Sequence, residues 1–243
     1  MSSILLLLDT KDSVDPSRPH DAVFNLNAFV KDDAFHAIKL KSVTFLNARY
    51  NIHSGNNTLV FQEDGVSANL VATLTPQNYS ATQLATELKT QLDAAGANTY
   101  TVTYNAQTLQ FTIATSGTSI KITGDSTCLR EIGFTAQTTF QASSTTSDLV
   151  VRLDGTQYVS VVSGLQSRNL NSNKYTNILA RVPVEEPVGT LIHYEVQDPT
   201  PQQFTPGTLT NFSVRLFDDR DNLYVLPSNC QIQYIYELSH HIH

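Results

Sequence analysis

The sequence predicts a mostly β protein, in which a single jelly roll (a Greek-key β-sandwich) carries a small inserted α+β domain. The first observation is composition: 10 tyrosines, 11 phenylalanines and many threonines accompany only 15% charged residues, which suits a pleated, half-buried surface. The second is apolar–polar alternation near both ends of the chain, typical of antiparallel strands with one buried face. The third is a single stretch of helical periodicity in the middle of the chain.

The first strand is predicted at the apolar run from Ile4 to Leu8. This run is shorter than the core of a signal peptide, which needs roughly 7–15 apolar residues, and no basic residue precedes it. We therefore expect a strand, and no secretion through a signal peptide. A second strand is expected around Phe24 and Leu26, which share one face.

The next strand contains a change of phase, in the stretch FHAIKLKSVTFLN. Ile38 and Leu40 occupy even positions, whereas Val43 and Phe45 occupy odd ones. A shift of one residue moves every later side chain to the other face of a sheet, so the pattern predicts a β-bulge near residues 41–42.

A helix is predicted between about Ser80 and Ala95. Ser80 and Gln83 have the spacing of a capping box, Leu84, Leu88 and Leu92 form one apolar stripe, and Gly96 is placed to end the helix. An alternating hairpin follows in YTVTYNAQTLQFTI, with Leu109, Phe111 and Ile113 expected opposite Tyr100, Val102 and Tyr104. Together these segments indicate an α+β insert over residues 66–135.

The polar stretch at residues 135–148 has no periodicity and is interpreted as a linker. Alternation then returns in the five stretches YVSVV, NILARVPV, TLIHYEV, NFSVRLF and QIQYIYEL. Neither β segment offers enough strands for a sandwich, so residues 1–65 and 136–243 are expected to pair and form one jelly roll around the insert.

Charge and cysteine content argue against several classes of protein. The net charge is −7 and the pI is near 5.4, whereas a nucleic-acid-binding protein normally carries a basic stripe. Cys128 and Cys230 show no metal-ligand or redox spacing, so we expect reduced structural thiols. No stretch approaches the roughly 20 apolar residues of a membrane span. We expect neither a nucleic-acid partner nor a membrane span.

Catalytic and metal-binding patterns are also weak. Asp218, Asp219 and Asp221 lie close together but lack the spacing of a calcium loop, so a turn between two strands is the favoured interpretation. Glu185, Glu186 and Glu195 could form a glycosidase pair, yet nothing distinguishes an acid from a base, and the chain has no tryptophan. The histidines lack a metal-ligand spacing, and the terminal HHIH is interpreted as a solvated end. We expect no enzyme activity, no cofactor and no metal.

The order of segments resembles a known family. ILLLLDTKDS leads to IKLKSVTFLNARYNIHSGNNTLVF, the helix-containing segment follows, and NKYTNILARVPV, LIHYE and TLTNFSVRLFDDRDNLYVL precede the terminal QIQYIYEL. This arrangement, from about Ser3 to Leu238, is similar to the penton (minor capsid) proteins of virophages, polinton-like viruses and related double-jelly-roll DNA viruses. The final turn departs from the family: it has Asp221 where a glycine is common, and no tryptophan precedes the last strand.

The resemblance implies a function and partners. Members of this family form the homopentamer that closes each fivefold vertex of an icosahedral virion, with the major capsid protein of the same virus as neighbour. The chain would then be a virion component assembled in the host cell, and its insert a surface decoration or host contact. Two alternatives stay open, a phage-type tail fibre or adaptor with three or six copies, and a carbohydrate-binding jelly roll.

Three residues are candidates for an assembly interface. Arg181 alternates with the apolar residues of NILARVPV, so its side chain should leave the core, and Pro183 is expected at the end of a strand or in an edge strand. The planar guanidinium suits pairing with a carboxylate across an interface. His193 and Glu195 share the face opposite Ile192 in the next strand.

Overall fold

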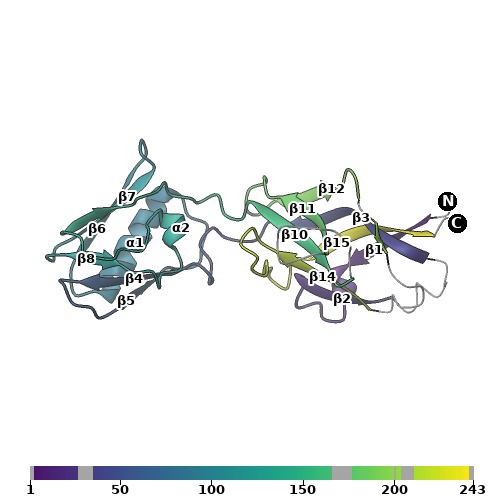
Figure 1. The fold of residues 1–243 in the computed structure, drawn as a ribbon, viewed down its shortest axis with the longest axis horizontal. Helices are drawn as coiled ribbons and strands as arrows, with labels where there is room; N and C mark the ends of the chain where they lie inside the picture. Colours follow the sequence, from purple (N-terminus) through teal and green to yellow (C-terminus); the bar gives the residue numbers. More distant parts are fainter. Residues whose placement is uncertain (1–2, 27–34, 166–176, 200, 204–210, 241–243) are drawn as a thin grey trace. The chain divides into compact units, whose positions relative to one another are not determined.

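The structure is a computed structural model that describes residues 3–26, 35–165, 177–199, 201–203 and 211–240 (Figure 1). The chain divides into two compact units. One unit, called here the jelly-roll unit, combines Met1–Arg49 with Thr156–His243. The other, called the insert unit, is Tyr50–Gly155. Each has its own hydrophobic core.

The jelly-roll unit is a sandwich of two antiparallel sheets. One sheet has the strand order β1-β15-β3-β12, with β13 also pairing β3, and the other has the order β11-β10-β14-β2. The first strand lies beside the last, and each sheet combines strands from both ends of the chain, as in a jelly roll. The elements are β1 (Ser3–Asp9), a 3-10 turn (Thr10–Asp12), β2 (Asp21–Asn25), β3 (Phe35–Leu46), β10 (Tyr158–Ser163), β11 (Ile178–Pro183), β12 (Leu191–Glu195), β13 (Gln202–Gln203), β14 (Asn211–Phe217) and β15 (Ile232–His240).

The predicted strand faces explain why the two sheets pack together. Alternate residues of each strand enter one core; β15, for example, contributes Ile232, Tyr234, Tyr236 and Leu238. The predicted bulge in β3 is confirmed. Ile235 pairs with Ser42, whereas the next residue, Tyr236, pairs with Leu40. Lys41 is thus the extra residue, and it keeps both halves of the strand facing the core.

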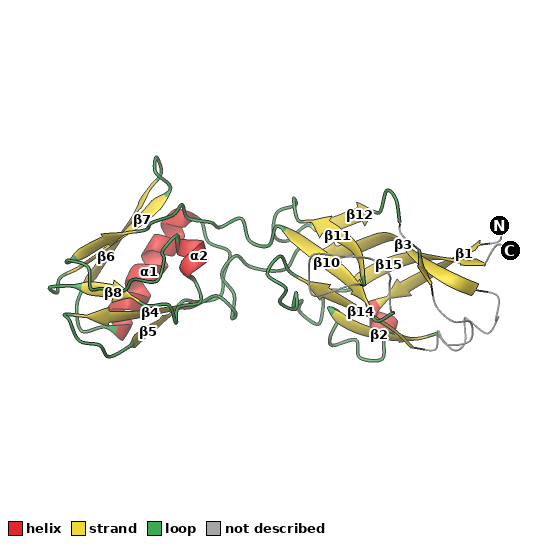
Figure 2. Ribbon diagram, viewed as in Figure 1, coloured by secondary structure: helices red, strands yellow, loops and turns green. Residues whose placement is uncertain are grey.

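The insert unit places two three-stranded sheets around a helix (Figure 2). The strand orders are β5-β4-β8 and β6-β7-β9. Leucines of α1 fill the core between them. The elements are β4 (Thr58–Glu63), β5 (Leu70–Thr73), α1 (Ala81–Ala95), β6 (Tyr100–Asn105), β7 (Gln110–Thr115), β8 (Ile120–Ile122), α2 (Leu129–Ile132) and β9 (Ser144–Thr146).

The start of α1 follows the prediction, but its end does so for a different reason. Ser80 and Gln83 form the expected capping box. Gly96 follows the helix with an ordinary φ of −99°, so no left-handed conformation requires glycine there. A Cβ at Gly96 would lie 2.4 Å from Oε1 of Glu63. Glycine therefore provides room for that buried carboxylate.

The hairpin is present with a shorter apolar pairing than expected. Val102 pairs with Ile113 and Tyr104 with Phe111. Leu109 instead lies in the turn with a φ of 58° and is exposed. Its apolar side chain fits the alternation, but its position in the turn prevents it from pairing.

The boundaries of the insert unit are wider than those predicted from the sequence. The predicted insert began at residue 66, yet β4 precedes that point and contributes buried Leu59 and Phe61 to the insert core. The predicted linker at 135–148 was wrong, because it contains β9, which pairs with β7. Its small hydroxyl side chains carry little apolar signal. They bond instead: the Thr112 and Thr146 hydroxyls lie 2.9 Å apart.

Two tyrosines of β15 place their hydroxyl groups in the core of the jelly-roll unit. The hydroxyls of Tyr234 and Tyr236 are buried with no hydrogen-bond partner among the residues that the structure describes, and burial raises the pKa of Tyr236 well above its ordinary value. Because an unpartnered buried hydroxyl is destabilising, Tyr236→Phe should leave stability unchanged or raise it by about 1 kcal/mol.

Tyr100 provides the matched comparison in the insert unit, because its hydroxyl donates to the buried carboxylate of Glu63. Tyr100→Phe should destabilise that unit by about 1–3 kcal/mol. Urea unfolding of the two variants checks both signs. A clear loss of stability in Tyr236→Phe would contradict this account of its hydroxyl.

Candidate assembly surface

The outer face of the β1-β15-β3-β12 sheet carries unusually exposed apolar side chains. In β1, Leu6 and Leu8 enter the core, so Leu5 and Leu7 point outward and are 63% and 71% exposed. At the other edge of the sheet, Leu191 of β12 is 66% exposed. Apolar side chains this exposed on one sheet are typical of a surface that a partner covers.

On β12, Leu191 shares this face with two polar residues. His193 and Glu195 are exposed on β12, with Nε2 of the histidine 3.7 Å from Oε1 of the glutamate. The other ring nitrogen of His193, Nδ1, lies 2.7 Å from the hydroxyl of Thr44 on the neighbouring β3. The contact with Thr44 ties the imidazole to the neighbouring strand, and Glu195 is open to solvent. An exposed pair of this kind adds little stability to the isolated chain.

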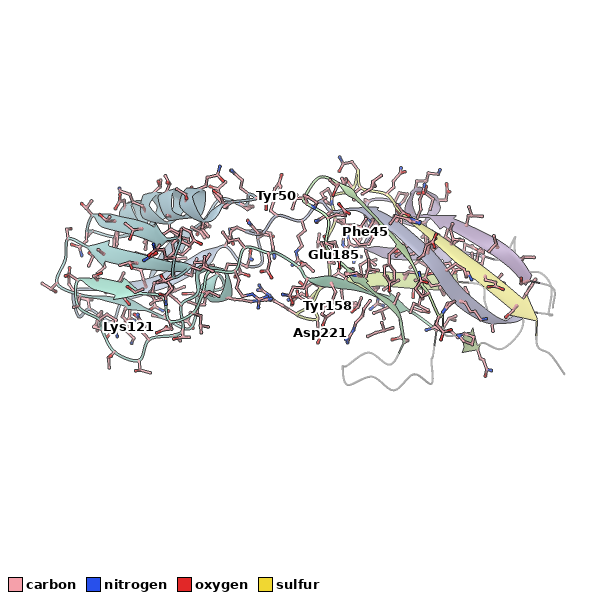
Figure 3. The ribbon with its side chains drawn as sticks, turned by 90° about the horizontal axis from the view of Figure 1, so that it is seen from above. Phe45, Tyr50, Lys121, Tyr158, Glu185 and Asp221 are labelled. Carbon is pink, nitrogen blue, oxygen red and sulfur yellow. The ribbon has the colours of Figure 1, made fainter. Side chains whose placement is uncertain are left out.

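Arg181 lies on β11, the edge strand of the other sheet. Its guanidinium carbon lies 5.1 Å from the ring centre of Tyr158, its diagonal neighbour on β10. Tyr158 is labelled in Figure 3. The aromatic ring supports the charge through a cation–π contact. No carboxylate within the described residues forms an ion pair with Arg181.

The three predicted interface residues are therefore not one cluster. Arg181 belongs to one sheet, whereas His193 and Glu195 belong to the other. Both strands are edge strands, consecutive along the chain, and Figure 1 shows them along the same border of the sandwich. Side chains on that border are presented to a partner without any change in the fold.

A buried ion pair supports the loops at one end of the sandwich, and sequence reasoning missed it. Nη1 of Arg49 lies 2.8 Å from Oδ2 of Asp218, with side chains only 12% and 3% exposed. The other oxygen of Asp218 accepts the backbone N–H groups of Arg220 and Asn222. Asp218 thus orders the Asp-rich turn that the sequence predicted, and pairs with a residue far away in sequence.

Tyr224 completes this cluster. The Arg49 guanidinium lies 5.2 Å from the centre of its ring, and its hydroxyl donates to Oδ1 of Asn47 at 3.3 Å. Burial raises the pKa of Tyr224 to about 12. Asn47 also donates to the carbonyl of Glu186. The cluster joins segments from three parts of the chain, and every group has a structural partner.

In the part of the chain that the structure describes, no group of three histidine, cysteine or acidic residues is placed to hold a metal. No described helix is long and apolar enough to cross a membrane. A cavity of about 260 Å³ lies on the outer face of the β11-β10-β14-β2 sheet. Among its described lining residues, Arg215 is the charged one, and it is paired with Asp21.

The fold of this chain is similar to that of a protein of known structure. A crystal structure of the selenomethionine-labelled penton protein of mavirus matches 99% of this chain and 100% of its own chain, with a TM-score of 0.51 and 13% sequence identity. The fold is penton-like. No protein-family model and no curated protein matches the sequence. The match spans both units, so the likeness includes the insert as well as the sandwich.

Proposed function

We propose that this chain is a viral penton, a minor capsid protein whose homopentamer closes the fivefold vertices of an icosahedral virion. The observation that carries the proposal is the end-to-end match to a penton protein of a chain built from a jelly roll and an insert. The exposed leucines and the polar edge strands are consistent with a protein that works in an assembly.

A five-membered ring requires two different contact surfaces on each copy. Fivefold rings use heterologous contacts, in which two different patches of the same chain meet. The outer surfaces of the two sheets differ. One sheet carries exposed leucines on its edge strands, and the other carries Arg181 and Arg215. Two copies of such a chain can therefore form a contact to which each copy contributes a different surface. The shell neighbour would be the major capsid protein, docked on the jelly-roll unit.

The mass of the native assembly tests the proposal. Native mass spectrometry of the purified chain is expected to show five copies, or 5 times its 26.8 kDa. Three or six copies would favour a tail-fibre or adaptor protein instead. A single copy that binds glycans on an array would favour a carbohydrate-binding module.

Arg181 is proposed as an interface residue of the pentamer. Its guanidinium is exposed and supported by Tyr158, so it can pair with a carboxylate of the next copy. Arg181→Ala should raise the concentration at which half of the pentamer dissociates by about tenfold, because a charge-assisted hydrogen bond contributes roughly 1.5–3 kcal/mol. Arg152→Ala, in the insert unit, is the control. An undiminished pentamer in Arg181→Ala would contradict the role.

The insert unit is proposed as a decoration or host-contact module. Because its core is separate from that of the sandwich, replacing residues 50–155 with a short glycine–serine linker should leave five copies in the native mass spectrum. Loss of the pentamer in a truncated protein that still folds would show that the insert takes part in assembly.

A further inference from the structure

We propose that neighbouring copies join their sheets edge to edge, with β12 of one copy pairing with β1 of the next. The four-stranded path β1-β15-β3-β12 would then continue from copy to copy around the ring. This inference rests on the proposed pentamer, because it names the surface through which the copies meet.

The first strand carries the sequence of a strand that is covered on both faces. Residues 4–8 read ILLLL, an uninterrupted apolar run, and such runs belong to strands buried on both sides. Among the residues that the structure describes, only the inner face of β1 is covered, by the core around Leu6 and Leu8, and Leu5 and Leu7 on the outer face are exposed. Leu7 pairs across the ladder with Ile235, so the apolar surface extends onto β15.

The free edge of β1 also lacks the features that prevent strand pairing. In the described chain, β1 forms a ladder with β15 alone. Natural proteins protect such edges with charges, prolines, bulges or very short strands. From Ser3 to Leu8 the strand has no charge, no proline and no register shift. It is therefore ready to accept another strand.

The edges of the second sheet are protected. β2 begins at Asp21, which forms ion pairs with Arg18 and Arg215. β11 contains Arg181 and Pro183 and has an irregular register with β10. These features disfavour regular pairing at either edge. The other edge of the first sheet, β12, has neither proline nor a register shift.

Strand direction makes β12 and β1 compatible. β1, β15, β3 and β12 are antiparallel in succession, so β12 runs opposite to β1. A copy rotated about an axis roughly parallel to the strands would bring its β1 antiparallel to β12. Pairing β1 with a second β1 would instead need a twofold axis, which a five-membered ring lacks.

The directions of the side chains are also compatible with pairing between β12 and β1. Leu191 points outward from β12, and Leu5 and Leu7 point outward from β1, while Ile192, Leu6 and Leu8 point into the core. Joining the strands would align the exposed leucines on one outer face, next to His193 and Glu195. Apolar cross-strand pairs of this kind stabilise sheets.

Engineered disulfides test the pairing directly. Directly opposed residues in antiparallel strands have Cα atoms about 4.5–5.5 Å apart, within disulfide reach, and the native Cys128 and Cys230 are both buried. Four double variants combine Leu5→Cys or Leu7→Cys with Leu191→Cys or His193→Cys. After mild oxidation, at least one is expected to give a non-reducing ladder of two to five chains.

The single variants separate the alternatives. Leu7→Cys alone should give no cross-linked product; a disulfide dimer would indicate pairing of two β1 strands and would overturn the proposal. If no double variant gave a ladder while the native mass spectrum still showed five copies, the proposed strand pairing would be overturned, but the proposed pentamer would not. A single copy at every concentration tested would contradict both proposals.

A charge substitution gives a second readout. Leu7→Lys places a charge on the exposed outer face of β1, without disturbing the core, and is expected to raise the concentration for half-dissociation of the ring by at least about tenfold. Val225→Lys, at another exposed position that lies outside both sheets, is the control. A ring as stable in Leu7→Lys as in the control would contradict the inference.

Discussion

Arg49→Ala is expected to lower the free energy of unfolding of the jelly-roll unit by about 3–5 kcal/mol. The substitution leaves the carboxylate of Asp218 without the guanidinium that lies 2.8 Å from it in a nearly solvent-free position. Removing one partner of a buried pair costs the desolvation of the remaining charge, which exceeds the net contribution of the pair itself. The Tyr224 ring also loses the cation beside it.

Arg18→Ala is the matched control. Arg18 forms an ion pair with Asp21 at 2.6 Å, but its side chain is 54% exposed. Exposed pairs contribute roughly 0–1 kcal/mol, so this variant should unfold close to the wild type. Hydrogen exchange measured by mass spectrometry follows β3 and β14 separately from the insert strands. If Arg49→Ala and Arg18→Ala lowered the free energy of unfolding by the same small amount, the result would contradict the view that burial strengthens the Arg49–Asp218 pair.

The sequence predicted the sandwich because local pattern and tertiary environment agree there. The bulge at Lys41 and the helix cap at Ser80 both follow from residues close together in sequence. The Arg49–Asp218 pair does not, because its members are 169 residues apart and each alone is typical of an exposed loop. Contacts of this kind become visible only once the topology is known.

The insert boundaries were missed for a related reason. β9 is a strand of serine and threonine whose stability comes from hydroxyl contacts and one buried threonine, so hydrophobic periodicity does not reveal it. β4 was placed with residues 1–65 in the jelly roll, although Leu59 and Phe61 belong to the insert core, because the apolar residues of a strand do not reveal which sheet it joins. The apolar run of β1 identified a strand, but only the structure shows that its outer face is uncovered.

Gly133→Ala is expected to destabilise the insert unit by about 2–5 kcal/mol, from left-handed strain and overpacking together. Gly133 ends α2 with a φ of 73°, where a side chain is strained. A Cβ there would also lie 2.3 Å from the carbonyl oxygen of Leu149. That oxygen belongs to the backbone, and Leu149 N–H donates to the carbonyl of Gly133, so neither segment can move away easily.

Gly65→Ala separates strain from contact. Gly65 has a φ of 74°, but a Cβ there meets nothing within 4 Å, so this variant should lose only the roughly 1–2 kcal/mol of left-handed strain. In hydrogen exchange, Gly133→Ala should lower protection in β4 and β7 and leave β3 and β15 unchanged, because the two cores share no residue. If protection fell equally in all four strands, the two units would unfold as one, and an insert that can be removed without loss of the ring would no longer be expected.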